Sequence, residues 1–268
     1  AEAWGLYEGQ LVAMIHSGSR GLGHQVCTDH VRHLERQFTS EDGGWRHETY
    51  DWWIPDRQLA AAPRHSPEAE AYLGAMGAAA NYAFANRAVL SQRLITALEV
   101  HTRSSVEWST VYDVAHNIAK DEEHVIDGKR CTCSVHRKGA TRAFPGSHDG
   151  LCPEHKATGQ PVLVPGDMGT GSWLMAGPKT AMNAAFGSSC HGAGRRLSRA
   201  AARKQVDVPA LMERLTAAGV HLKHGTERGL AEEAPEAYKP VDDVVDATEE
   251  AGLARRVAKL VPRVVVKG

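Results

Sequence analysis

Two long segments of the chain carry the hydrophobic pattern of helices. Residues 22–38 place apolar side chains at helical spacing, and residues 67–101 form an alanine-rich stretch with a helical pattern. Apolar side chains that recur about every 3.6 residues lie on one face of a helix. The pattern therefore predicts two helices, the second of which ends near Arg103.

Four shorter runs of apolar or β-branched residues predict strands. The first leads into a glycine-rich turn at Gly18, the second ends just before His116, and the third is closed by Pro165 and Gly166. The predicted strands are residues 10–15, 106–114, 161–164 and 261–266.

The remaining segments are polar, charged or rich in glycine. Helices and strands alternate irregularly, which predicts an α+β fold. We expect a loop or excursion with three tryptophans at 39–56, turns and short strands at 121–159, a tight loop at 187–194, a basic helix at 195–204, and an acidic, then amphipathic tail at 241–259.

Length and composition narrow the class of protein. The 268 residues contain 31 Lys and Arg against 32 Asp and Glu, a net charge of −1, so any site for nucleic acid must be local. Apolar residues make up 42%, yet no run approaches the roughly 18 residues of a membrane span. Five cysteines and no secretory signal suit a reducing cytosol. We expect a soluble, cytoplasmic protein without a membrane partner.

Two glycine-rich loops each place an arginine four positions after a histidine. They are HSGSRGLGH, with His16 and Arg20, and GSSCHGAGR, with His191 and Arg195. Glycine lets backbone N–H groups approach a ligand closely, and the arginine fork matches phosphate oxygens. Either loop alone is equally well an ordinary turn with a surface histidine, whereas the pair predicts a phosphate site.

His116 follows a predicted strand in VYDVAHN, a common place for a ligand. Neutral imidazole binds borderline divalent metals, although a single histidine of this kind is more often a satisfied core residue. The segment 137–146, RKGATRAFPG, has the composition of a solvated hairpin tip, and 165–173, PGDMGTGSW, is a weak signal for an anion cradle.

A cysteine and histidine set has a spacing that allows a structural zinc ion. The order is C-x-C, eighteen residues, then C-x-x-H, which offers four ligands for a tetrahedral site. The alternative is free thiols in a loop that tolerates cysteine. The four residues are Cys131, Cys133, Cys152 and His155.

Taken together and in order, the motifs resemble those of the RtcB family of tRNA-splicing and RNA-repair ligases. The resemblance covers His16 to Gly268, which implies an RtcB-like fold in which helices flank β-sheets. Its motifs are HSGSRGLGH, NYAFANR, VYDVAHN, VHRKGATRAFPG, PGDMGTGSW, SSCHGAGR, EAPEAYKPVDDVV and VVVKG.

The resemblance implies a role for each histidine motif. His191 would attack the α-phosphate of GTP and become guanylylated, with the amides of Ala193 and Gly194 beside the phosphate. His16 and His116 would be ligands in a site for two Mn²⁺ ions, which neutralise the triphosphate.

The resemblance also implies binding residues for guanine and for RNA phosphates. Lys267 can donate to the guanine O6, an acceptor that adenine lacks. Arginine and lysine contacts to phosphates fix register without reading sequence. The guanine site would comprise Asp167, Met168, Ser172, Tyr238 and Lys267, and the RNA phosphate contacts Arg20, Lys138, Arg195 and Arg199.

The implied reaction joins an RNA 3′-phosphate or 2′,3′-cyclic phosphate to a 5′-hydroxyl. GMP passes from GTP to His191 and then to the RNA 3′-phosphate, and attack by the 5′-hydroxyl releases it. The implied partners are tRNA halves or damaged RNA, and an archease-like activator.

The sequence departs from the family pattern in two places. Asp167 stands where the family often has serine, so its carboxylate would face the nucleotide or a nearby N–H group. The family's other metal ligands, an aspartate, a cysteine and a histidine, precede these motifs, and the chain starts on an apolar run as if inside a domain. We expect residues 1–268 to be one domain truncated at its N-terminus, inactive alone.

Two other functions remain open at this stage. A metal-dependent phosphoesterase would use the same histidines and arginines for hydrolysis and release free GMP or nucleoside. A non-catalytic paralogue would retain RNA without dependence on GTP.

Overall fold

The computed structural model describes residues Ala1–Gly268, and they form two compact units. One unit comprises Ala13–Ile118, and the other comprises Ala1–Val12 with Ala119–Gly268. We call them the helical unit and the sheet unit and describe each by itself. The expectation that residues 1–268 form one domain stays a prediction.

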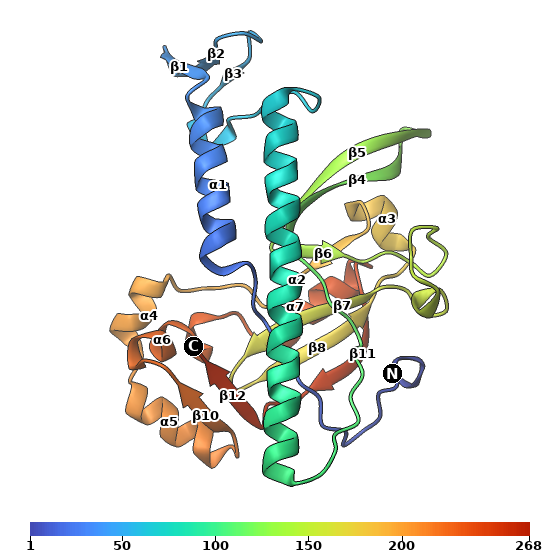
Figure 1. Ribbon diagram of the computed structural model, residues 1–268, viewed down its shortest axis with the longest axis vertical. Helices are drawn as coiled ribbons and strands as arrows, with labels where there is room; N and C mark the ends of the chain where they lie inside the picture. The colour runs from blue at the N-terminus through green and yellow to red at the C-terminus, as the bar shows by residue number, and fades with distance from the viewer. The chain divides into compact units, whose positions relative to one another are not determined.

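The helical unit consists mainly of two helices that lie side by side, α1 (Arg20–Glu35) and α2 (Pro67–Thr102) (Figure 1). Ser66 caps α2 by accepting a hydrogen bond from the Ala69 amide at 3.2 Å, and Pro67 occupies the first turn. The helix ends at Arg103, whose left-handed backbone (φ 54°) stops it. Both predicted helices are therefore confirmed. No helix of the structure combines the length and apolar character that crossing a membrane requires.

The segment predicted as a loop at 39–56 contains a small antiparallel sheet. Its strands are β1 (Phe38–Glu41), β2 (Gly44–His47) and β3 (Trp53–Ile54), and the 3₁₀ helix η2 (Arg57–Leu59) follows. Asp42 and Gly43 form the two-residue turn between β1 and β2, with Gly43 at φ 76°. An Asp-Gly pair between extended segments is a strong hairpin signal, so the loop prediction was wrong.

Two predicted strands are absent. Residues 10–15 and 106–114 have irregular backbone, and Leu11 is 78% exposed rather than buried. Apolar and β-branched residues favour a strand only where a neighbouring strand accepts their backbone hydrogen bonds. No strand of the described residues pairs with either segment, so both predictions were wrong.

An antiparallel sheet with the order β11-β8-β7 forms the core of the sheet unit. Helix α7 (Val241–Glu250) packs against it, and Val162, Val164 and Val245 are fully buried between them. The strands are β7 (Pro161–Asp167), β8 (Gly171–Ala176) and β11 (Arg255–Leu260).

Two boundaries in this region differ from the prediction. Strand β7 continues through Pro165 and Gly166 to Asp167, because the register shifts after Val164 and a bulge accommodates the proline. The tail predicted at 241–259 divides into helix α7 and strand β11.

Antiparallel strands occupy the segment where turns and short strands were expected. β4 (Asn117–Ile126) pairs with β5 (Lys129–Lys138), and each is ten residues long. β6 (Ala140–Arg142) pairs antiparallel with β9 (Ser188–Cys190), so the loop predicted at 187–194 begins as a strand. The 3₁₀ helices η1 (Glu2–Trp4) and η3 (Pro153–His155) and helix α3 (Thr180–Ala185) complete this region.

A second hydrophobic cluster contains buried residues of two helices, α5 and α6, and packs against a parallel strand pair. β10 (His221–His224) pairs with β12 (Val264–Lys267), which confirms a terminal strand. The basic helix is shorter than the predicted 195–204, since Ser198 caps it and it starts at Arg199. The helices are α4 (Arg199–Gln205), α5 (Val208–Ala217), α6 (Glu227–Glu232) and η4 (Pro235–Ala237), and the buried residues include Met168, Leu211, Leu215, Val220 and Leu230.

Candidate functional site

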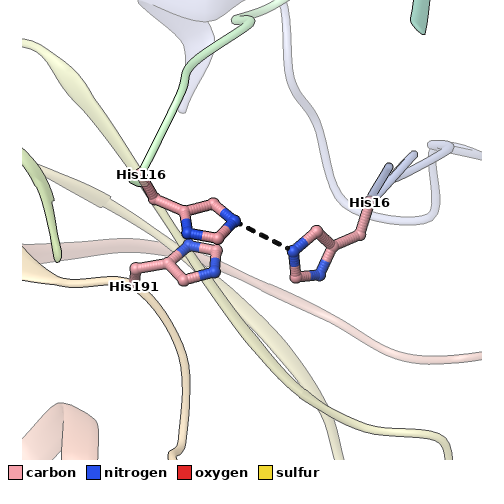
Figure 2. Close-up of side chains that lie close together, drawn as sticks. All are labelled: His16, His116 and His191. Atoms are coloured by element: carbon pink, nitrogen blue, oxygen red, sulfur yellow. Dashed lines mark hydrogen bonds between the residues drawn. The ribbon is translucent and has the colours of Figure 1, made fainter. Parts of the chain in front are cut away.

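His16 and His116 face each other within the helical unit although 100 positions separate them in the chain. Their Nε2 atoms are 3.2 Å apart, and the rings meet edge to face with centroids 5.3 Å apart (Figure 2). His16 is exposed and His116 is half-buried. The structure therefore brings together the two residues predicted as metal ligands.

The separation of the two nitrogens fits ligands that share one ion. Two donors each about 2.1 Å from an ion lie about 3.0 to 3.4 Å apart in octahedral or tetrahedral geometry. Without an ion, one ring can donate an N–H to the other. Two imidazoles alone do not select manganese, which prefers oxygen ligands. The donor set fits a divalent transition metal, and Mn²⁺ rests on the resemblance.

The surroundings of His116 favour the neutral ring. Burial of the side chain and the nearby His16 both lower the pKa of His116, with burial the larger cause. Only a deprotonated imidazole nitrogen can bind a metal, so a lowered pKa keeps this ligand competent at neutral pH.

Neighbouring side chains on α2 hold the loops that carry these histidines. The Asn86 side chain donates to the Ser17 hydroxyl at 3.0 Å and to the Gly18 carbonyl at 2.9 Å. Arg87 donates to the Ser17 carbonyl at 3.1 Å and to the Asp113 carboxylate at 2.6 Å. The sequence had indicated no role for Asn86, Arg87 or Asp113. Their places in NYAFANR and VYDVAHN were the only signal that it contained.

His191 lies in the sheet unit, directly after β9, and its side chain is half-buried. The chain after it is fixed at two points, because the Ala193 amide donates to the Pro165 carbonyl at 3.0 Å and the Lys239 amide donates to the Gly194 carbonyl at 3.0 Å. Gly192 has φ 151°, and a Cβ there would lie 3.2 Å from the Pro165 carbonyl oxygen. The histidine thus sits on a restrained turn. Its shared site with His16 and His116 stays a prediction.

The amides of Ala193 and Gly194, predicted to lie beside a phosphate, differ in their surroundings. The Ala193 amide is engaged with Pro165, so it is not a donor for a nucleotide in this arrangement. Gly194 is exposed and can still be approached.

Asp167 stabilises the turn between β7 and β8. Its carboxylate accepts hydrogen bonds from the amides of Gly169 and Thr170 at 2.7 and 2.9 Å and from the Thr170 hydroxyl at 2.7 Å. The Asp167 carboxylate was expected to face either the nucleotide or a nearby N–H group, and it faces N–H groups of its own turn. The neighbouring Met168 is 2% exposed in the hydrophobic core. Its side chain therefore packs inside the protein.

Ser172 stands opposite the bulge of β7. Its hydroxyl accepts a hydrogen bond from the Gly166 amide at 3.2 Å, and its side chain is half-buried. This contact ties β8 to the irregular end of β7.

Tyr238 and Arg195 form a polar cluster with Glu233. The Tyr238 hydroxyl donates to the Glu233 carboxylate, and Arg195 donates to that hydroxyl at 3.1 Å with its guanidinium 4.9 Å from the ring centre. Burial of the ring, together with the Glu233 contact, raises the pKa of Tyr238 to about 12. The phenol is therefore neutral and can donate or accept at physiological pH.

Arg195 was predicted to contact RNA phosphates, but its guanidinium is already occupied. Its other nitrogens donate to the carbonyls of Leu197 at 3.1 Å and Glu232 at 2.6 Å. All three nitrogens of the fork thus bind protein atoms, and they tie the chain after His191 to α6 and Tyr238. The contact of Arg195 with RNA phosphates stays a prediction.

The other predicted cations lie in different settings. Arg20 begins α1 with φ 52°, and both it and Lys138, at the end of β5, are exposed. Arg199 begins α4 with a side chain that is 70% exposed, 3.7 Å from Glu232. Lys267 is half-buried at the end of β12, where the Gly225 amide donates to its carbonyl.

The segment 137–146 is not a solvated hairpin tip. Arg137 is 5% exposed and forms two hydrogen bonds to the Glu122 carboxylate at 2.7 and 2.8 Å, and it also donates to the Ser188 hydroxyl. Phe144 is 2% exposed. Charge alone suggested exposure, whereas a bidentate ion pair allows the arginine to be buried.

The residues predicted to bind zinc each have other surroundings. The thiols of Cys131 and Cys133 point toward main-chain carbonyls of β5, and Cys152 is exposed. His155 is buried edge-on against the Trp4 ring, with centroids 6.4 Å apart. Zinc binding stays a prediction without support from these contacts.

Comparison with known proteins identifies the family. The sequence model described as tRNA-splicing ligase RtcB matches residues 1–268. The chain belongs to the RtcB family. The mixed helices and strands of the structure agree with the α+β fold that this membership implies.

Several curated RtcB proteins are similar to the whole chain but longer. The tRNA-splicing ligase RtcB of Thermococcus kodakarensis is 48% identical over 271 residues, which cover 100% of this chain and 54% of that protein. The RNA-splicing ligase RtcB of Mycobacterium tuberculosis is 48% identical over 268 residues, with coverage of 100% and 59%. The tRNA-splicing ligase RtcB of Methanocaldococcus jannaschii is 47% identical over 272 residues, with coverage of 100% and 27%. The chain therefore spans between 27% and 59% of these RtcB relatives.

Proposed function

We propose that the chain carries the nucleotide-transfer part of a GTP- and manganese-dependent RNA ligase. The ligase joins RNA 3′-phosphate or 2′,3′-cyclic phosphate ends to 5′-hydroxyl ends in the cytoplasm, in tRNA splicing or RNA repair. Family membership supports the reaction class. The observation that carries the proposal is the 3.2 Å approach of the His16 and His116 nitrogens, because separate loops converge there on a donor pair suited to a metal.

The metal would neutralise the triphosphate and orient the attacking group, the usual role of divalent ions in phosphoryl transfer. His16 and His116 would hold one ion, and the lowered pKa of His116 keeps its ring neutral for this purpose. The reaction would use two Mn²⁺ ions, and His16 and His116 would bind one of them.

His191 acts as the nucleophile in the first of three balanced exchanges. Its imidazole nitrogen forms a bond to the α-phosphorus of GTP while the bond to pyrophosphate breaks, and pyrophosphate leaves with the electron pair. The RNA 3′-phosphate then takes the GMP, which frees the imidazole. Finally the 5′-hydroxyl oxygen attacks the activated 3′-phosphorus, loses its proton to solvent and displaces GMP.

Guanine and RNA are bound by the residues that remain accessible. Tyr238 and Lys267, with Ser172 near the β7–β8 turn, provide a neutral phenol, a cation and a hydroxyl that can recognise guanine. Arg20, Lys138 and Arg199 are exposed cations that can contact RNA phosphates. The whole protein would have an archease-like activator as a partner.

A joining assay tests this function. Because the relatives are longer than the matched residues, the assay uses a chimera in which this chain replaces the matching segment of the Mycobacterium tuberculosis relative. Two RNA oligonucleotides, one with a 3′-phosphate and one with a 5′-hydroxyl, are incubated with GTP and Mn²⁺. We expect a joined product that depends on GTP, and at least a roughly tenfold lower rate for His16→Ala and for His116→Ala.

The matched control is His24→Ala, which removes an exposed histidine of α1 and should join at the wild-type rate. Release of free GMP or nucleoside without joining would instead favour a phosphoesterase. Retention of RNA without GTP dependence would favour a non-catalytic binding protein.

A further inference from the structure

Two loops without regular secondary structure carry the paired histidines of the helical unit. Residues 13–19 precede α1, and residues 104–116 follow α2. Neither segment belongs to a sheet, so backbone ladders do not fix the positions of His16 and His116. Since the two nitrogens nevertheless approach to 3.2 Å, other contacts must hold the loops.

Arg87 is the side chain that contacts both loops at once. Its Nε donates to the Asp113 carboxylate at 2.6 Å, three residues before His116, and its Nη1 donates to the Ser17 carbonyl at 3.1 Å, directly after His16. The side chain is only 11% exposed, so these charge-assisted contacts are shielded from water. Residue 87 lies well inside the 36-residue helix α2, a rigid base.

Asn86 adds a second fixed point on the first loop only. Its side-chain amide donates to the Ser17 hydroxyl and to the Gly18 carbonyl. The two adjacent side chains therefore act differently. Asn86 orients the loop of His16, whereas Arg87 links that loop to the one that carries His116.

We propose that Arg87 is a positioning residue that presets the distance between the His16 and His116 imidazoles for one divalent metal ion, by linking Ser17 to Asp113. This inference rests on the metal site of the proposed function and assigns Arg87 no contact with the ion. A planar fork with several donors suits this double contact, whereas lysine offers a single ammonium that cannot reproduce its geometry.

Metal affinity of the whole chain tests the inference without any need for activity. Mn²⁺ binding is measured by calorimetry, and by electron paramagnetic resonance of the free ion, for the wild type, Arg87→Met and Arg87→Lys. Loss of residues that orient metal ligands typically weakens binding about 10- to 100-fold. We expect at least a roughly tenfold weaker affinity for Arg87→Met and an intermediate value for Arg87→Lys.

The matched control is Arg93→Met, which removes an exposed arginine from the same helix and should bind Mn²⁺ as the wild type does. Asp113→Asn combined with Arg87→Met should weaken binding little more than Arg87→Met alone, because both changes break the same link. Circular dichroism shows whether α2 is retained. If Arg87→Met unfolds, Arg87→Lys and Asp113→Asn decide the question through the same affinities.

The outcomes separate the inference from the proposed function. If His16→Ala and His116→Ala bind Mn²⁺ as tightly as the wild type, the metal site itself is wrong. If those variants lose the ion while folded Arg87→Met and Asp113→Asn bind it like the wild type, the positioning role of Arg87 is overturned and the metal site stands.

Discussion

Individual polar residues in this protein hold the turns of the candidate site as well as supplying groups to it. Asp167 accepts hydrogen bonds from the amides of the β7–β8 turn. Arg195 donates hydrogen bonds to Tyr238, Glu233 and two main-chain carbonyls. A carboxylate or guanidinium that lies beside buried N–H or C=O groups forms hydrogen bonds with those groups. Fewer of its atoms are then available to bind a ligand. Residue chemistry read from a motif therefore overestimates how many groups remain for substrate.

Tyr238→Phe is predicted to destabilise the protein by about 1–2 kcal/mol at pH 8, because it leaves Glu233 and Arg195 without the hydroxyl. The raised pKa of Tyr238, about 12, adds a pH dependence. A group whose pKa is raised on folding stabilises below its unfolded pKa of about 10 and loses that contribution as pH rises through the folded value.

The difference between wild type and Tyr238→Phe should therefore shrink as the pH rises from 8 to 11, measured by urea denaturation. Tyr82→Phe, at a tyrosine that is 50% exposed on α2, should cost almost nothing at either pH. A difference for Tyr238→Phe that grows with pH would contradict the assigned cluster.

The sequence predicted residues of the site better than their contacts. His16 and His116 could be named from their motifs, and the structure pairs them. Arg87 could not be given its role, because its partner Ser17 lies 70 positions away and nothing local in NYAFANR indicates that contact. The contact of the Ala193 amide with Pro165 could not be predicted either, because that carbonyl belongs to the distant strand β7.

Among the elements, those determined by local sequence were the ones that could be predicted. The helices α1 and α2 follow from spacing within one segment. The strands expected at 10–15 and 106–114 failed because a strand requires a partner, which the local pattern does not supply. The β1–β2 hairpin was readable from Asp42 and Gly43, so that error came from overlooking a local signal.

A buried ion pair joins the two strands of the β4–β5 hairpin, and its arginine also contacts the strand before His191. The side chains of Arg137 and Glu122 are 2% and 6% exposed, and Arg137 also donates to the Ser188 hydroxyl in β9. Arg137→Met should cost about 3–5 kcal/mol, because it leaves the buried Glu122 carboxylate without its guanidinium partner.

The double variant Glu122→Leu with Arg137→Met is the matched comparison for this pair. It should lose less stability than the sum of the single variants in urea denaturation, since it removes both charges. Losses that simply add would show that the two side chains do not act as a pair.

At the scale of the whole molecule, the candidate site residues lie in both compact units. The sheet unit contains His191, Tyr238 and Lys267, and the helical unit contains His16 and His116. The chain matches the RtcB family throughout and covers 27% to 59% of the relatives compared with it. The reaction that we propose depends on one covalent bond, between His191 and the guanylyl group.

The most direct measurement is the mass of the protein after incubation with GTP and Mn²⁺, followed by peptide mapping under conditions that preserve acid-labile phosphorus–nitrogen bonds. A chimera in which this chain replaces the matching segment of the Mycobacterium tuberculosis relative should gain one guanylyl group on the peptide that contains His191. His191→Ala should gain none, while His136→Ala, at an exposed histidine of β5, should be labelled like the wild type. A guanylyl group that persists in His191→Ala, or free GMP without any adduct in the wild type, would contradict the account.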